Sequence, residues 1–588
     1  MRIIKKILIA NRGEIALRIQ RTARKLNIAV VAIYTLDDQD AAFVQEADEA
    51  VLLPGDTLAE TYLNIEKIIQ IAQQYQVDAI HPGYGFLSEN KNFIDACSVA
   101  NIKFIGPPKT AVHAMGNKIE ARINAIKAGV QVTPGITGSS IELLEQYTTI
   151  GFPILIKAAA GGGGKGMKVV HHQNELAEAI ESTAREAKNY FGDDTIYMEK
   201  YIAHPRHIEV QVLGDEHGNM VHLFERECSI QRRHQKIIEE APSISISDEV
   251  RKNVCNAAVQ LAKSIGYYSA GTMEFLLDDQ QQFYFLEMNT RIQVEHPVTE
   301  MITGIDIVAQ QIAIAEGREL GLHQDEITHK GHAIECRIYA ENPEKNFLPS
   351  PGKIALYQEP TLSEIRIDGM KLKNGSVVSG DFDPMIAKLI VHGNDRNDAL
   401  AKMSKALKQY IITGIDTNVE FLNHFVQSPT VLNNQFSTKY IDENIQTILK
   451  NIEQKKSETL TTTALAAAIS FFLQQATEVK NIWEQIGFWR MISFLPLEMN
   501  GQAQNIEIIK NNENEIQFIL GETIFQLQIK KRKEHQINFI LNEKYVEAQV
   551  VSLASNTCMI LIDGYQFKVN RKDELDHTEV YHSKSDSN

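Results

Sequence analysis

Carboxylate and amide side chains recur at close spacing in one short segment near the middle of the chain. Two apolar runs rich in β-forming residues, 271–277 and 283–289, flank the polar loop 278–282, a pattern that predicts an antiparallel hairpin. If Phe283 lies opposite Asp278, counting outward from the loop places Glu274 directly opposite Glu287. The hairpin is therefore expected to bring two carboxylates face to face.

Two facing carboxylates need positive charge between them, because like charges opposite each other destabilise a strand pair. The two-residue period of a strand places Asn289 and Arg291 on the same face as Glu287. Carboxylate and amide oxygens are ligands for a hard cation such as Mg²⁺, and a guanidinium binds anions. The segment predicts a metal site beside an anion site; the alternative is a solvated polar face on a surface hairpin.

A run of four glycines, 161–164, followed by Lys165, joins two strand-like segments, 152–157 and 167–170. A Walker A loop joins a strand to a helix, so this run is not one. Successive glycines let backbone N–H groups approach phosphate oxygens, and Lys157 and Lys165 add positive charge. Because four glycines are costly to order, we expect a loop that closes over a bound ligand, with a flexible linker as the alternative.

A second basic cluster occupies residues 231–236, where Arg232, Arg233, His234 and Lys236 fall within five residues of an acidic protein. Such a cluster predicts an anion pocket, and the alternative is a solvated loop. Upstream, the alternating run 206–212 places His207, Glu209 and Gln211 on one face. The run 199–202 has the character of a connection whose backbone reads a purine edge.

Composition excludes several other classes. The 588 residues are too many for one core, and the net charge of −16 argues against a nucleic-acid surface. The five cysteines are far apart and form no CxxC pair, so neither a disulfide framework nor a zinc site is predicted. With neither a signal peptide nor a membrane span expected, the sequence predicts a cytoplasmic protein.

The chain opens with a strand (7–10), a helix (14–26) and a second strand (28–34), which predicts a parallel sheet. Only one glycine follows the first strand, so the dinucleotide-binding fingerprint is absent. The loop 81–85 is interpreted as a turn, and Ser88 as the cap of the next helix. Beyond an alanine-rich helix (461–476), short alternating runs from 505 to 569 predict an antiparallel sandwich or barrel.

Residues 6–448 resemble the biotin carboxylase component of the biotin-dependent acyl-CoA carboxylases, within the ATP-grasp superfamily. The resemblance to methylcrotonyl- and propionyl-CoA carboxylase α subunits extends, through pattern more than motif, to the helix and barrel. The matching motifs are contiguous and in the family's order: ANRGEIA (10–16), HPGYGFLSEN (81–90), GGGGKGM (161–167), ERECSIQRRHQK (225–236) and EMNTRIQVEHP (287–297).

The resemblance implies ATP-dependent carboxylation of biotin with bicarbonate through carboxyphosphate, as the first half-reaction of an acyl-CoA carboxylase. It implies that Lys236, Arg291, Gln293 and the backbone of Val294 grip bicarbonate, that Glu295 is the general base and that Arg337 stabilises the biotin oxyanion. Mg²⁺ or Mn²⁺ would be ligated by Glu274, Glu287 and Asn289. The residues implied to hold ATP are Lys118, Lys157, Gly163, Gly164, Glu199, Lys200, Tyr201, Ile202, His207, Gln231 and His234.

The same resemblance implies the fold and its division. An α/β N-terminal domain (1–114) precedes an ATP-grasp domain (115–330) with a mobile lid at about 132–203. An α+β C-terminal biotin carboxylase domain (331–448), a helix plus antiparallel β-barrel for subunit interaction (459–575) and a polar tail (576–588) complete the chain.

The implied partners are a biotin carboxyl carrier protein or domain, a carboxyltransferase β subunit and further copies of this chain, with no nucleic acid and no membrane. The α subunits that it resembles end in a biotinyl domain with an Ala/Val-Met-Lys-Met motif, which these residues do not contain. Biotin is therefore expected on a carrier and not on this chain, or the chain is a truncated form. The alternatives to a biotin carboxylase are a non-catalytic assembly subunit and a different ATP-grasp ligase joining a carboxylate to an amine.

Overall fold

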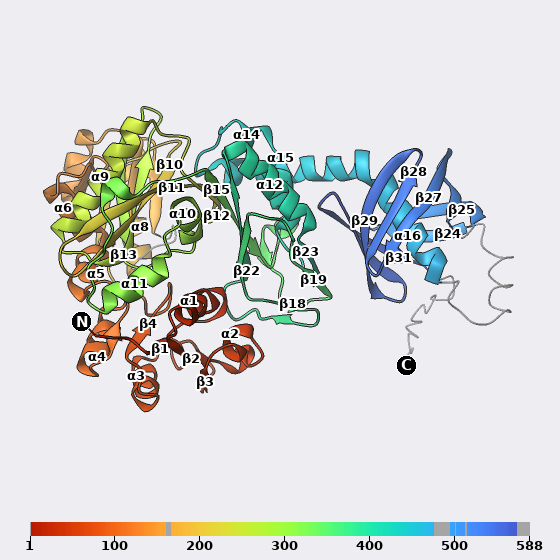
Figure 1. Ribbon diagram of the computed structural model, residues 1–588. Coiled ribbons are helices and arrows are strands. Elements are labelled where there is room, and N and C mark those ends of the chain that lie inside the picture. The colour runs from red at the N-terminus through yellow and green to blue at the C-terminus, as the bar shows by residue number, and fades with distance from the viewer. Residues whose placement is uncertain (1, 160–165, 476–493, 500, 512–513, 573–588) are drawn as a thin grey trace, which may run out of the picture.

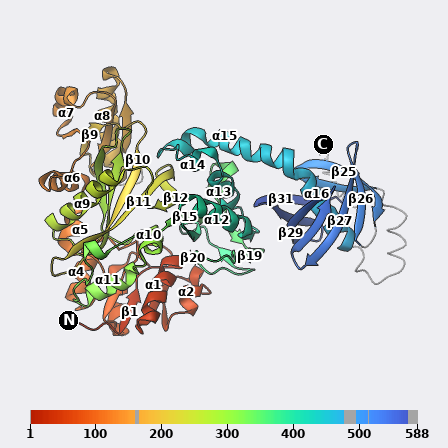
Figure 2. The same cartoon turned by 45° about the horizontal axis from the view of Figure 1, so that its top comes forward.

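A computed structural model describes residues 2–159, 166–475, 494–499, 501–511 and 514–572. The chain forms a large core of three packed parts and a separate barrel, which projects from the core at the end of a long helix (Figure 1). The view in Figure 2 shows the same separation from a second direction. Predicted residues Gly163 and Gly164 lie outside the described residues.

The first part is a five-stranded parallel sheet in the order β3-β2-β1-β4-β5. This confirms the parallel sheet predicted from the opening strand–helix–strand pattern. The helix after the loop at 81–85 begins later than predicted, because Asn90 and not Ser88 accepts the free N–H groups of its first turn. The elements are β1 (Lys6–Ile9), α1 (Gly13–Lys25), β2 (Ala29–Tyr34), α2 (Ala42–Gln45), β3 (Glu49–Leu52), α3 (Ile65–Gln74), β4 (Ala79–His81), α4 (Lys91–Val99) and β5 (Lys103–Phe104).

The second part is a small antiparallel sheet in the order β6-β9-β7-β8, reached through two helices. The two segments that flank the glycine run in the sequence are the strands β7 and β8, as predicted, and they pair antiparallel. In Figure 2 this sheet and its helices project at the edge of the core opposite the barrel. Its elements are α5 (Lys109–Gly116), α6 (Lys118–Lys127), β6 (Gly135–Thr137), α7 (Ser140–Gln146), β7 (Ile154–Ala158), β8 (Met167–Val170), α8 (Gln173–Phe191) and β9 (Ile196–Lys200).

The third part is an eight-stranded sheet in the order β14-β13-β10-β11-β12-β15-β22-β20. It is continuous through the pairing of β12 with β15, so residues on either side of 330 share one sheet. Its strands are β10 (Arg206–Gly214), β11 (Met220–Arg232), β12 (Gln235–Ala241), β13 (Ser269–Leu277), β14 (Phe283–Asn289), β15 (His332–Tyr339), β20 (Ile365–Gly369) and β22 (Met385–Gly393). Its helices are α9 (Asp248–Ser264), α10 (His296–Thr303), α11 (Ile307–Ala315), α12 (Arg396–Gln409), α13 (Val419–Val426), α14 (Pro429–Leu432) and α15 (Tyr440–Lys455).

Three additional two-stranded sheets belong to this part of the described chain. They join β16 (Glu341–Asn342) to β17 (Leu348–Pro349), β18 (Gly352–Lys353) to β21 (Val377–Val378) and β19 (Leu356–Gln358) to β23 (Ile411–Thr413). Among the described residues, no single helix is long and apolar enough to cross a bilayer. The helices α10 and α11 meet that test only as a pair bent by 96°.

The barrel is a closed ring of antiparallel strands, β24 to β31, with β24 paired to β31. Helix α16 (Thr461–Gln475) packs against its strands, and the side chains of 464–469 are fully buried there. The predicted antiparallel barrel is confirmed, but its first strand was missed because Pro496 interrupts the pattern. The strands are β24 (Phe494–Met499), β25 (Gln502–Asn511), β26 (Glu515–Leu520), β27 (Thr523–Lys533), β28 (Gln536–Leu541), β29 (Lys544–Ala554), β30 (Thr557–Ile562) and β31 (Tyr565–Arg571).

Candidate active site

A cavity of about 770 Å³ lies between the small sheet β6–β9 and the large sheet. Every predicted site residue that the structure describes lines it, so segments from 118 to 337 converge on one space. Those residues are Lys118, Lys157, Glu199, Lys200, Tyr201, Ile202, His207, Gln231, His234, Lys236, Glu274, Glu287, Asn289, Arg291, Gln293, Val294, Glu295 and Arg337.

The hairpin β13–β14 forms one wall and pairs Glu274 with Glu287, as predicted. The premise of that prediction was wrong, because Phe283 lies opposite Leu277 and not Asp278. A bulge at Leu286 adds one residue to β14 between Phe285 and Glu287 and so restores the pairing. Without the bulge, Glu287 would face the other side of the sheet.

Glu274 is surrounded by donors, which supply the positive charge that two facing carboxylates require. Its Oε1 accepts hydrogen bonds from Lys236 Nζ, Asn289 Nδ2 and Gln293 Nε2, each at 2.9 Å. His207 Nε2 lies 3.2 Å from its Oε2. Burial acts to raise the pKa of Glu274, but Lys236 and His207 outweigh it and hold that pKa well below the usual range. Burial alone would lower the pKa of His207, and the Glu274 charge raises it to about 9.

The donor set of Glu274, Glu287 and Asn289 fits a hard divalent cation. Burial and the neighbouring Glu274 charge raise the pKa of Glu287, an unfavourable arrangement that a bound cation would relieve. The amide oxygen of Asn289 accepts from Arg291 Nη2 at 2.9 Å. All three residues line the cavity, and their carboxylate and amide oxygens have the hardness that Mg²⁺ and Mn²⁺ prefer.

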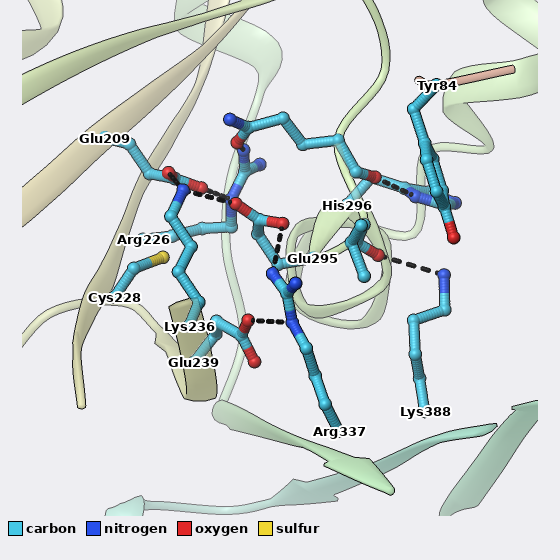
Figure 3. A network of polar contacts seen from close by, with 12 residues as sticks. Tyr84, Glu209, Arg226, Cys228, Lys236, Glu239, Glu295, His296, Arg337 and Lys388 are labelled. Carbon is cyan, nitrogen blue, oxygen red and sulfur yellow. Dashed lines mark hydrogen bonds and ion pairs between the residues drawn. The ribbon is translucent and has the colours of Figure 1, made fainter. Parts of the chain in front are cut away.

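Lys236, on β12, is the centre of the charged network. Its Nζ donates to Glu209 Oε2 at 2.6 Å, Glu295 Oε1 at 2.7 Å and Glu274 Oε1 at 2.9 Å. Figure 3 shows the ammonium between Glu209 and Glu295. Burial acts to lower the pKa of Lys236, and these three carboxylates together raise it well above its ordinary value. One cation thus serves three buried anions.

Arg337, on β15, connects this network to a second carboxylate. Its Nη2 donates to Glu295 Oε2 at 2.9 Å, and its Nε donates to Glu239 Oε1 at 2.5 Å (Figure 3). Burial and the Glu209 charge act to raise the pKa of Glu295, but Lys236, Arg337 and Arg226 outweigh them and lower it. Glu295 is therefore held as a carboxylate between two cations, in the state that a general base requires.

Arg291 is held by a loop from the N-terminal sheet. Its Nε lies 3.1 Å from Glu89 Oε2, while Glu89 Oε1 accepts from the backbone N–H of Thr290 at 2.9 Å. Nearby, the buried Lys388 donates to the carbonyl of Val294 at 2.9 Å and pairs with Glu14 at 3.0 Å. The motif at 81–90, interpreted from sequence as a turn at 81–85, therefore also reaches this site through Glu89.

The far end of the cavity combines lysines with apolar side chains. Lys157 forms an ion pair with Glu199, and Thr133 Oγ1 donates to Glu199 at 2.8 Å. Lys200 also lines the cavity, but its Nζ is engaged by the Phe152 carbonyl, to which it donates at 2.8 Å. Sequence reasoning missed the apolar lining on both sides of the slot: Leu155, Met167, Val169, Leu276 and Leu286. These residues come from the strands β7 and β8 and from the hairpin, and an apolar lining of this kind can accept an aromatic ring.

Arg226 is a second functional residue that sequence reasoning missed. It is fully buried, and its guanidinium donates to Glu209 at 2.5 Å, Gln211 at 2.9 Å and Gln293 at 3.1 Å. It therefore fixes both a partner of Lys236 and a residue predicted to contact bicarbonate. Arg226 lies within the motif at 225–236, but only the fold shows that its side chain is buried in this network.

Family models match three consecutive segments of the chain. They are described as the biotin carboxylase N-terminal domain (residues 3–112), the carbamoyl-phosphate synthase L chain ATP-binding domain (117–323) and the biotin carboxylase C-terminal domain (335–443).

Several known proteins share much of the sequence. The chain is 44% identical over 519 residues to the mitochondrial methylcrotonoyl-CoA carboxylase subunit alpha of Dictyostelium discoideum, covering 87% of this chain and 74% of that one. It is 47% identical over 444 residues to biotin carboxylase 1 of Bacillus subtilis, covering 75% and 98%.

Solved structures match the core. A biotin carboxylase from Campylobacter jejuni in a β,γ-ATP complex is 47% identical, with a TM-score of 0.73, and the match covers 75% of this chain and 99% of that one. The biotin carboxylase domain dimer of Hydrogenobacter thermophilus 2-oxoglutarate carboxylase, in complex with MgADP, ADP and bicarbonate, is 44% identical, with a TM-score of 0.73 and coverage of 76% and 99%.

Proposed function

The chain belongs to the biotin carboxylase family and catalyses ATP-dependent carboxylation of biotin, and we propose that the cavity described above is where the reaction takes place. The observation that carries the proposal is the continuous chain of contacts from Glu274 through Lys236 and Glu295 to Arg337. It links the predicted metal ligands, the predicted base and the predicted biotin contact in a single network.

Bicarbonate binds between Arg291 and Lys236, with Gln293 and the backbone of Val294 completing the site. The two cations match the charge of the anion, and Arg226 and Lys388 hold Gln293 and Val294 in place. This arrangement orients one bicarbonate oxygen toward the nucleotide.

Glu295 removes the bicarbonate proton. It starts as a carboxylate because Lys236 and Arg337 stabilise its charge. The deprotonated oxygen attacks the γ-phosphorus, the bond to ADP breaks, and carboxyphosphate forms. Carboxyphosphate then splits into CO₂ and phosphate, the phosphate takes the ureido N–H proton of biotin, and the resulting nitrogen anion attacks CO₂. Arg337 donates to the ureido oxygen while it carries the negative charge.

ATP occupies the slot between the small sheet and the hairpin. The adenine lies against the apolar residues that include Leu155 and Leu276, near the backbone of Tyr201 and Ile202. Lys118 and Lys157 supply positive charge to the phosphates, and His207, Gln231 and His234 line the same cavity. Gly163 and Gly164, outside the described residues, belong to the proposed phosphate-binding set. Mg²⁺ or Mn²⁺ held by Glu274, Glu287 and Asn289 supplies charge neutralisation at the phosphates.

The barrel is the surface that meets the rest of a carboxylase complex. Its projection from the core on α15 leaves it accessible to a carboxyltransferase β subunit (Figure 2), and the relative from Dictyostelium discoideum is named as a subunit alpha. A biotin carrier protein or domain presents biotin to the cavity, and the chain acts as a homo-oligomer within the complex. The same proposal includes a division into domains at 1–114, 115–330, 331–448 and 459–575, with a mobile lid at about 132–203. It also includes a cytoplasmic location, which agrees with five cysteines that are all buried and unpaired, as in a reducing compartment.

The test is release of phosphate from ATP by the whole protein with free biotin, measured with and without bicarbonate. We expect release that depends on bicarbonate and is lost in Glu274→Ala and Arg291→Ala. Release that is indifferent to bicarbonate would overturn the proposal.

A further inference from the structure

Two glutamates, Glu239 and Glu335, lie opposite each other on neighbouring strands, and Glu239 contacts Arg337. The register of β12 and β15 pairs Glu239 with Glu335, and both side chains are fully buried. Glu239 Oε1 accepts from Arg337 Nε, but Glu239 Oε2 and both carboxylate oxygens of Glu335 have no hydrogen-bond partner among the described residues. Neither glutamate belongs to the site residues predicted from sequence.

Two buried carboxylates opposite each other cannot both be ionised at low cost. Burial raises the pKa of both, and the charge of the other carboxylate raises that of Glu335 further. The cations nearby are few: Arg337 and Lys236 face Glu239, and Lys388 and Arg337 face Glu335, while Glu295 adds negative charge to both and Cys336 lies beside them. Lys236 and Lys388 are already bonded to other groups.

We infer that Glu239 and Glu335 share one proton and together act as a positioning pair for Arg337, an inference that rests on the proposed role of Arg337 toward biotin. Glu239 carries the single negative charge that holds the guanidinium. Glu335 carries the proton and donates a hydrogen bond to the free oxygen of Glu239. The cross-strand pair then holds one buried negative charge and not two.

The pair matters because the other partner of Arg337 changes charge during the reaction. When Glu295 takes the bicarbonate proton, it loses the negative charge that binds Arg337 Nη2. Glu239 keeps its own bond to Nε through that step, so the guanidinium stays in place while Nη2 becomes available to the ureido oxygen. A neutral Glu239 would leave Arg337 without an anionic partner at that moment.

The test compares two rates in the whole protein: carboxylation of free biotin, and bicarbonate-dependent ATP cleavage without biotin. We expect Glu239→Gln to lower the ratio of carboxylation to ATP cleavage about tenfold or more, because the ion pair with Arg337 becomes a hydrogen bond to a neutral amide. The KM for biotin should rise in the same variant, and the KM for ATP should not change.

Glu335 is tested by rescue. Glu335→Leu removes the proton donor to Glu239 and should lower the ratio as Glu239→Gln does, whereas Glu335→Gln keeps an N–H donor and should restore it to within about threefold of wild type. Glu240→Gln is the matched control: Glu240 is the next residue on β12, is also buried, and bonds Arg396 at 2.6 Å and His332 at 2.7 Å. It should leave the ratio unchanged whatever it does to the melting temperature.

The outcomes separate this inference from the proposed function. The positioning role is tested provided that Arg337→Gln abolishes carboxylation. In that case it is overturned if Glu239→Gln leaves the ratio unchanged, whether both rates stay at the wild-type level or fall equally. If Arg337→Gln itself leaves carboxylation intact, the proposed role of Arg337 fails, and the inference falls with it. Glu239→Gln preserves shape and volume, so it keeps the test decisive even if Glu335→Leu does not fold.

Discussion

At the scale of single residues, the site is an arrangement of buried charges in which cations are shared. Lys236 bonds three carboxylates, and Arg337 bonds two. Removing one member of such a group leaves its partners buried without compensation, so a substitution here changes chemistry and stability together. The state of each group is set by its neighbours, which is why Glu295 is ionised while Glu287, also flanked by a carboxylate, has a raised pKa.

Glu295→Gln tests the proposed base. The single amide oxygen can accept from only one of Lys236 and Arg337, which donate to different oxygens of Glu295, and the amide cannot take a proton from bicarbonate. We expect bicarbonate-dependent phosphate release to fall by about a hundredfold or more, the range for loss of a general base. The KM for ATP should stay near the wild-type value, because Glu295 does not line the nucleotide end of the cavity.

The control is Glu225→Gln. It neutralises a buried carboxylate that does not line the cavity and that accepts a hydrogen bond of 2.8 Å from Arg251. Initial-rate measurements on both variants check the prediction. A Glu295→Gln protein that keeps half of its activity would show that the proton is taken by another group.

At the scale of elements, the sequence patterns predicted what lies along a strand better than what lies across it. The hairpin, the strand–glycine–strand unit and the parallel N-terminal sheet follow from local patterns of apolar and turn residues. The bulge at Leu286 could not be predicted, because nothing in the local pattern distinguishes an extra residue in β14 from a longer loop. The pairing of Glu239 with Glu335 joins strands almost a hundred residues apart, so it depends on the fold of the whole sheet.

His81, at the end of β4, should make the protein sensitive to mild acid. It is fully buried, its Nδ1 accepts from the Gly83 N–H at 3.1 Å, and burial lowers its pKa to about 3. The unfolded chain has an ordinary histidine pKa of about 6.5, so between these values the unfolded state binds more protons than the folded state. Stability from this group is therefore complete above about pH 6.5 and is lost as the pH falls toward 3, by about 1.4 kcal/mol per pH unit.

We expect wild type to lose about 2 kcal/mol more than His81→Asn between about pH 7 and pH 5, since asparagine can accept the same backbone hydrogen bond but does not titrate. Urea unfolding at the two pH values measures the difference. Equal losses in the two proteins would mean that His81 is already protonated or exposed in the folded state.

At the scale of the whole molecule, the barrel meets the core through an apolar cluster of Leu356, Ile411, Val551 and Leu561 and through several polar contacts. Lys456 Nζ lies 3.1 Å from Glu420 Oε1, and Glu420 Oε2 accepts from the backbone N–H of Gln566 on β31 at 2.8 Å. Asn423 Nδ2 donates to the Asp563 carbonyl at 3.1 Å in the neighbouring turn. These polar contacts tie the barrel unit to α13, alongside the apolar cluster.

Lys456→Met should therefore loosen the barrel without affecting the chemistry. Burial raises the pKa of Glu420, and Lys456 opposes that shift, so removing the lysine leaves an uncompensated carboxylate at the junction. We expect a loss of about 3 kcal/mol in the free energy of unfolding, the cost of breaking a buried pair from one side. Adding Glu420→Gln should recover most of it, because the neutral amide still accepts from Gln566 and no charge remains buried.

Urea unfolding and limited proteolysis at the junction measure both effects. Carboxylation of free biotin, which needs only the core cavity, should match wild type in both variants. A single variant as stable as wild type, or a double variant no better than the single, would mean that the ion pair does not hold the barrel in place.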